Sequence, residues 1–133
     1  RQRSATDGYM TATALFWVVI GGALGATLRY AVAVLIGSQA FPWATMLSNI
    51  AGSLIIGVIW GACADQAWFQ GWGRLFLVVG LLGAFTTYSA FALETLLLLQ
   101  SDRILMAALY CLATLMTCLL AVWFGMRLGQ WVS

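Results

Sequence analysis

The chain has 133 residues, of which 63% are hydrophobic and 8% charged, with a net charge of +2. Soluble domains average about 25% charged residues. A chain of this length folded in water would bury only about two-thirds of its surface, so much of this apolar content would face solvent. The composition therefore excludes a soluble domain and indicates a protein of the lipid bilayer. The small, dispersed charge also excludes a polybasic segment that binds nucleic acid or lipid headgroups.

Four uncharged or nearly uncharged stretches are long enough to cross a bilayer, which takes about 20 mainly apolar residues. Pro42 lies in the first short connection, where it can start the second helix. The sequence thus predicts an all-α membrane protein with one four-helix transmembrane domain over residues 1–133. A polar segment, 1–13, is expected outside the membrane. The predicted spans are 14–36, 44–64, 75–99 and 104–126.

The basic residues give a weak preference for orientation. With alternate loops on opposite sides, the arginines of one side are Arg1, Arg3, Arg74 and Arg127, and those of the other are Arg29 and Arg103. Such a small bias allows the chain to insert both ways round. Four helices are hardly enough to enclose a pore and still face lipid, so we expect an oligomer, most simply a two-fold dimer.

The third span has the least regular pattern in the chain. Gly80 and Gly83 precede Thr86 and Thr87, and consecutive threonines are weak helix formers. We expect the helix to break here, near mid-membrane, because non-helical backbone at that depth survives where it is buried in protein or lines water. Carbonyls freed by a break are good ligands for a hard cation such as Na⁺. The alternative is a continuous helix with a small-residue packing patch.

Polar side chains inside the spans are the candidates for function, since each is costly in hydrocarbon without a partner. Asn49, in the second span, either bonds to a neighbouring helix or donates to an aqueous vestibule. Tyr88 and Phe91 share one face of the third span, where their ring edges can meet an anion or simply pack in a core. Tyr110, Thr114 and Cys118 lie on one stripe of the fourth span.

Charged and hydroxyl groups near these positions extend the set. Glu94 is the only acidic residue in a span; a hydroxyl, amide or arginine would satisfy it, and it is the one candidate to carry protons. Arg29 either snorkels to the interface or biases a vestibule toward anions. The hydroxyls of Thr87 and Ser89 can donate to an anion. The three cysteines are interpreted as small core residues: Cys63, Cys111 and Cys118.

Together these segments resemble the CrcB/Fluc family of fluoride channels. The matching segments follow the family's order, one in each span, and cover the chain from about residue 15 to 128. They are GGALGATLRY at 21–30, ATMLSNIAGS at 44–53, GLLGAFTTYSAFALE at 80–94 and LLAVWFG at 119–125. The resemblance implies a passive, fluoride-selective channel that exports cytoplasmic fluoride. It further implies an antiparallel, dual-topology homodimer in the bacterial inner membrane, with two pores at the dimer interface.

The resemblance also assigns residues. The fluoride pore would be lined by Asn49, Tyr88, Ser89, Phe91, Tyr110 and Thr114. Vestibule or other polar positions would be Arg29, Thr87 and Glu94. Backbone carbonyls of Gly83 and Thr86 would hold a structural Na⁺ on the two-fold axis. Three positions depart from the family pattern: Tyr88 where Phe is usual, Ala90 where Ser or Thr is usual, and Cys118 in place of a hydroxyl residue.

Other classes of protein would show different features in the sequence. A small multidrug-resistance transporter would carry a glutamate in its first span, but 14–36 has no acidic residue. A proton-coupled fluoride antiporter would use Glu94 as its carrier. A purely structural subunit would leave the break in the third span without a purpose. No grouping of base, nucleophile and metal ligand indicates an enzyme.

Overall fold

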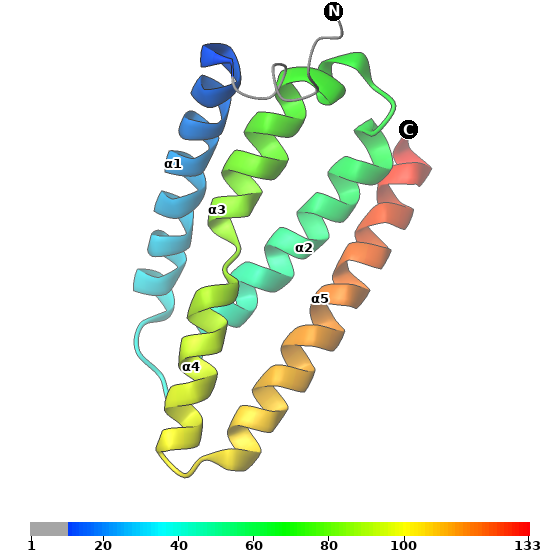
Figure 1. Ribbon diagram of the computed structural model, residues 1–133. Coiled ribbons are helices and arrows are strands. Elements are labelled where there is room, and N and C mark those ends of the chain that lie inside the picture. The colour runs from blue at the N-terminus through cyan, green and yellow to red at the C-terminus, as the bar shows by residue number, and fades with distance from the viewer. Residues whose placement is uncertain (1–10) are drawn as a thin grey trace, which may run out of the picture.

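The computed structural model describes residues 11–133, so most of the predicted polar tail, with Arg1 and Arg3, lies outside the described residues. Four helical segments are each long and apolar enough to cross a membrane, which confirms the predicted all-α, four-span fold (Figure 1). The third segment is made of three pieces. The elements are α1 (Ala12–Ile36), α2 (Trp43–Cys63), η1 (Phe69–Leu82), α3 (Gly83–Phe85), α4 (Tyr88–Gln100) and α5 (Ile104–Val132).

Local chemistry explains the ends of the first two helices. The Thr11 hydroxyl accepts a hydrogen bond from the Ala14 N–H at 3.2 Å and caps the start of α1. Gly37 ends α1 with φ of 72°, a left-handed conformation that glycine adopts without strain. Pro42 directly precedes α2, as the sequence predicts.

Two of the helical segments run farther than the uncharged stretches that predicted them. The third begins at Phe69, before Arg74, and the fourth continues past Arg127 to Val132. The Arg74 guanidinium lies 5.6 Å from the centre of the Trp60 ring, and that of Arg127 lies 5.8 Å from the Trp123 ring. Each charge is therefore held against an aromatic face, and the helix continues through it.

The helices pack as two close pairs, α1 with η1 and α3, and α2 with α5. Glycines permit both approaches. A Cβ at Gly125 would lie 3.0 Å from the Val58 nitrogen and closer still to the Leu54 carbonyl oxygen. On α1, a Cβ at Gly25 would overlap the backbone of Leu81 in the same way. Small residues at these crossings let the backbones come within contact distance, as is common between membrane helices.

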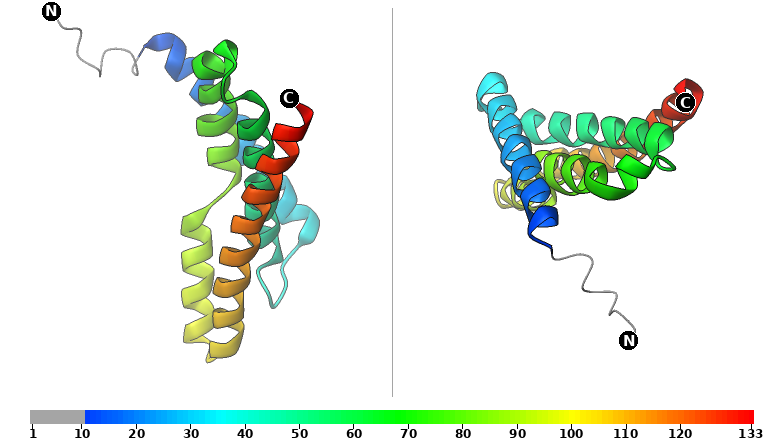
Figure 2. Two further views of the ribbon diagram at one scale, coloured as in Figure 1. Left: turned by 90° about the vertical axis from the view of Figure 1, so that its right-hand side faces the viewer. Right: turned by 90° about the horizontal axis from the view of Figure 1, so that it is seen from above.

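The third segment is interrupted between α3 and α4, in agreement with the predicted break. Thr86 (φ −82°, ψ 155°) and Thr87 (φ −150°, ψ 124°) are both extended. The side view of Figure 2 shows this link as a short straight trace between two offset helices. Upstream, η1 winds as a π-helix and has one non-helical residue, Gly71.

Tryptophan is distributed unevenly along the bundle. Of the seven in the chain, Trp43 alone lies at the end where α2 begins. The others lie toward the end where α1 begins and α5 finishes (Figure 1): Trp17, Trp60, Trp68, Trp72, Trp123 and Trp131. Several of these rings touch; those of Trp17 and Trp72 are 5.0 Å apart. Because Trp concentrates at membrane–water interfaces, this end of the bundle is the one that the tryptophans mark as an interface.

Candidate functional site

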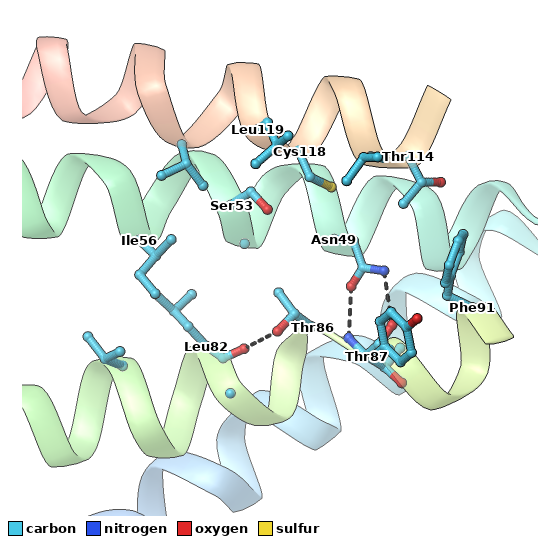
Figure 3. A pocket seen from close by; sticks show the side chains of 16 residues that line it. Asn49, Ser53, Ile56, Leu82, Thr86, Thr87, Phe91, Thr114, Cys118 and Leu119 are labelled. Carbon is cyan, nitrogen blue, oxygen red and sulfur yellow. Dashed lines mark hydrogen bonds between the residues drawn. The ribbon is translucent and has the colours of Figure 1, made fainter. Parts of the chain in front are cut away.

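A cavity of about 460 Å³ lies between the third segment and α5, with α2 as its floor (Figure 3). Its walls come from α2, η1, α3, α4 and α5, so residues far apart in sequence meet here. The lining residues with polar atoms or a thiol in their side chains are Asn49, Ser53, Thr86, Thr87, Tyr88, Thr114 and Cys118. The other lining residues are the glycines Gly52 and Gly83 and residues with apolar side chains.

Asn49 holds the break in the third segment. Its Nδ2 donates to the Thr87 carbonyl oxygen at 3.0 Å, and its Oδ1 accepts from the Thr87 N–H at 2.8 Å (Figure 3). One side-chain amide therefore satisfies the Thr87 N–H, which has no helical acceptor. It also adds a second donor to the Thr87 carbonyl, which as the N-cap of α4 accepts the first bond of that helix. An Nδ2 group carries two hydrogens, so one donor of Asn49 remains beside the cavity. The side chain combines both roles considered for it, since it bonds to a neighbouring element and also faces a cavity.

Two carbonyls lose their helical donors at the same place. The Gly83 oxygen would accept from the Thr87 N–H in a continuous helix, but that group donates to Asn49. The Thr86 oxygen would accept from the Ala90 N–H, which instead donates to the Thr87 hydroxyl at 3.2 Å. These are the two carbonyls that the resemblance assigns to Na⁺. Within residues 11–133, no group of three or more His, Cys, Asp or Glu side chains could hold a metal ion. Backbone carbonyls freed at a helix break can themselves coordinate a cation.

Arg29 secures the other side of the break. Its Nε donates to the Ala84 carbonyl oxygen at 3.0 Å, at the end of α3. A positive charge at the carboxyl end of a helix is favourable, because the last carbonyls there are unsatisfied. Arg29 also lines a second cavity, of about 330 Å³, together with Thr45, Ser48, Thr87 and Glu94. The side chain therefore faces a polar hollow and binds backbone at the same time.

Glu94 is satisfied by hydroxyl groups, one of the three kinds of partner considered for it. Thr45 Oγ1 and Tyr110 OH each donate to its carboxylate at 2.7 Å. Tyr110 is fully buried, with its ring 5.4 Å from Phe41 and 5.0 Å from Phe91. The structure thus places Tyr110 in the core beside Glu94, and neither side chain lines the cavity of Figure 3.

The aromatic pair lies at the edge of that cavity. Tyr88 and Phe91 both line it, and their ring centres are 5.7 Å apart. Tyr88 is 81% exposed in the single chain, so its ring projects away from the bundle. Ser89 points elsewhere: it is exposed, lies 3.3 Å from the Thr87 hydroxyl and does not line the cavity.

Thr114 stands out among the polar side chains of the cavity. It is 8% exposed, and its hydroxyl oxygen is buried with no hydrogen-bond partner in the described part of the chain. Buried hydroxyls are nearly always hydrogen-bonded, because an unpaired one costs about 1–3 kcal/mol. That oxygen has almost no accessible surface, so it is enclosed by the protein and does not open into the cavity.

Sequence reasoning did not assign Ser53 and Cys118 to the site. Ser53 follows Asn49 by four residues on α2, and Cys118 follows Thr114 by four residues on α5. Both line the cavity. The helical period was the available signal, because residues four apart share a face. The other two cysteines, Cys63 and Cys111, are partly buried and do not line it.

Comparisons with known proteins agree with this arrangement. The family described as "CrcB-like protein, Camphor Resistance (CrcB)" matches residues 16–126. Three similar proteins are each named fluoride-specific ion channel FluC. That of Flavobacterium psychrophilum is 40% identical over 87% of this chain and 96% of its own length. That of Thermus thermophilus is 42% identical over 84% and 91%. That of Novosphingobium aromaticivorans is 41% identical over 93% and 100%. The chain therefore belongs to the CrcB family.

Proposed function

We propose that this chain forms a passive, fluoride-selective channel that lets fluoride leave the cytoplasm. The observation that carries the proposal is the spare amide donor of Asn49 beside a cavity that hydroxyl and aromatic side chains also line. Three relatives at about 40% identity are named fluoride-specific ion channels. The proposed role is transport and not catalysis.

The chemistry of the cavity suits this anion. Fluoride is small and strongly hydrated, so a selective path must replace its water with several close donors and still release it. The spare Nδ2 hydrogen of Asn49 and the hydroxyl of Ser53 are such donors. The positive ring edges of Tyr88 and Phe91 add a further attraction. A passive channel is sufficient for export. HF enters the cell from acid surroundings and ionises in the neutral cytoplasm, which traps fluoride there. The negative-inside membrane potential then drives the anion out through the channel.

The antiporter alternative depends on Glu94. Two hydroxyls donate to this carboxylate, which suits the ionised, acceptor-only form. A proton carrier would have to break these bonds in each cycle, and Glu94 is absent from the lining of the larger cavity. These contacts favour the channel.

We propose that the working unit is an antiparallel homodimer in the bacterial inner membrane. The uneven distribution of tryptophan supports it, because two oppositely oriented subunits would provide an aromatic belt at both interfaces. Tyr88, exposed in one chain, would then be covered by the partner. Reporters fused to the C-terminus are expected on both sides of the membrane, and a single orientation would contradict the proposal.

We further propose that the carbonyls of Gly83 and Thr86 bind Na⁺ as a structural ion. Their helical donors are diverted to Asn49 and Thr87, which supports this assignment. The expected result is a higher thermal unfolding temperature in Na⁺ than in the bulky cation N-methylglucamine. Equal unfolding temperatures in the two salts would contradict the site.

Fluoride efflux from liposomes tests the channel directly. Purified protein is reconstituted in fluoride-loaded vesicles, and release is followed with a fluoride electrode beside a chloride control. We expect rapid fluoride release without chloride release, and no need for a proton gradient. Release that requires a proton gradient would indicate the antiporter, and Glu94→Gln should then abolish it. No release from folded protein would contradict the transport function.

A further inference from the structure

Two arginines lie at the end of the bundle that the tryptophans mark as an interface (Figure 1). The guanidinium of Arg74, on η1, lies over the Trp60 ring, and that of Arg127, on α5, lies over the Trp123 ring. All four side chains are exposed. In the described part of the chain, the only acidic residue at this end is Asp65, so the two arginines give the end a net positive charge.

The two guanidinium groups lie at a similar depth in the membrane. Arg74 is held against Trp60, and the next residue of α2, Gly61, contacts α5, since a Cβ there would lie 3.1 Å from the Gln130 nitrogen. Arg127 precedes Gln130 by about one turn of the same helix. Both arginines therefore face the same layer of the bilayer.

The length of α5 identifies that layer. The helix has 29 residues, and at this length it is about 43 Å long, whereas the hydrocarbon of a bilayer is about 30 Å thick. About 6 Å of helix thus extends beyond the hydrocarbon at each end. Arg127 lies about 8 Å before the last residue, Val132, and so at the boundary between hydrocarbon and headgroups. A long side chain at this boundary reaches the lipid phosphates.

The hydrogen-bond donors of these two arginines are available to such a phosphate. Arg29 and Arg103 each donate to a backbone carbonyl oxygen, at 3.0 and 3.5 Å. In residues 11–133 the guanidinium groups of Arg74 and Arg127 instead lie over ring faces, which supply no oxygen acceptor for their N–H donors. A guanidinium binds a phosphate through two parallel hydrogen bonds, which gives both strength and defined geometry.

We propose that the two arginine–tryptophan pairs, Arg74 with Trp60 and Arg127 with Trp123, form a binding surface for anionic phospholipids. The guanidinium groups hold the phosphate, and the indole rings pack against the upper part of the acyl chains. A zwitterionic lipid offers the same phosphate but adds an ammonium group, which the net positive charge of this end repels. The surface therefore selects lipids with a net negative charge, such as phosphatidylglycerol. The inference holds whichever ion the protein transports.

Lipid retention in native mass spectrometry tests this surface. The full chain is purified in a neutral detergent and supplied with equal amounts of phosphatidylglycerol and phosphatidylcholine, and the bound molecules of each lipid are counted. Each basic side chain near an anionic headgroup contributes roughly fivefold to affinity, so phosphatidylglycerol should be retained about twentyfold more than phosphatidylcholine. Equal retention of the two lipids by the unaltered chain would overturn the inference.

Variants assign the preference to the two pairs. Arg74→Gln combined with Arg127→Gln should bring the ratio of the two lipids to about one, and each single variant should lower it about fivefold if the double variant does not fold. Arg103→Gln is the matched control, because it removes the same charge from an exposed arginine at the opposite end of the bundle and should keep the preference. An unchanged ratio in the folded arginine variants, or an equal loss in Arg103→Gln, would contradict the proposed surface.

Discussion

Replacing Asn49 with leucine is expected to reduce fluoride efflux about a hundredfold or more and to destabilise the fold. Leucine has a similar shape but leaves the Thr87 N–H without a partner and removes one of the two donors to the Thr87 carbonyl. An unsatisfied buried N–H costs about 1–3 kcal/mol, so the free energy of unfolding should fall by about that amount. Thermal unfolding in detergent and efflux from liposomes measure the two effects.

Two further substitutions identify why Asn49→Leu loses stability and efflux. Gln39→Leu also removes an amide that donates to a carbonyl, that of Ile36, but at an exposed position, so its effect on unfolding should be within about 0.5 kcal/mol. Asn49→Asp keeps an acceptor for the Thr87 N–H but loses the donor and adds a negative charge. It should fold better than the leucine variant and still conduct poorly. Normal efflux in both Asn49 variants would show that this side chain lies off the path.

Gly125→Ala is expected to destabilise the fold by forcing α2 and α5 apart. The new Cβ would lie within 3.0 Å of Val58 backbone and would overlap the Leu54 carbonyl oxygen, so α2 and α5 must separate. Overpacking of this kind typically costs about 1–3 kcal/mol. The α2–α5 pair carries one wall and the floor of the cavity, so efflux should fall together with the unfolding temperature.

Gly22→Ala is the matched control, because a Cβ at Gly22 would meet no atom within 4 Å. The same methyl group should leave the unfolding temperature unchanged or raise it, since alanine is favoured over glycine in a helix by about 1 kcal/mol. Equal destabilisation by the two alanines would contradict the close α2–α5 contact as the cause.

The sequence predicts the positions of the helices more accurately than it predicts which side chains contact one another between them. Composition and apolar runs were enough to predict four spans. The glycine–threonine pattern was enough to predict the interruption at Thr86 and Thr87. The ends were less accurate, because Arg74 and Arg127 were taken as boundaries. Trp123 lies one turn before Arg127 on the same helix, so the helical period could have paired these two, whereas Trp60 and Arg74 lie on different helices.

For the site, residue type predicted several of the side chains but not how they pair. Asn49, Phe91 and Thr114 were candidates from residue type, and the structure brings them to one cavity. The pairing of Glu94 with Tyr110 depends on the relative height of two helices, which periodicity does not specify. For that reason the burial of Tyr110 beside Glu94 was not predicted, and its assignment to the pore stays a prediction. The proposed pore positions stay predictions until efflux is measured.

The link between α3 and α4 is anchored to two different helices, and this has a mechanical consequence. Arg29 of α1 binds Ala84 just before the link, and Asn49 of α2 binds Thr87 within it. Neither half of the third segment can swing about the link without giving up one of these hydrogen bonds. An interruption that would otherwise act as a hinge is thereby made a rigid joint. Discrimination between anions would then depend on a cavity already shaped before the ion arrives, with no closing movement around it.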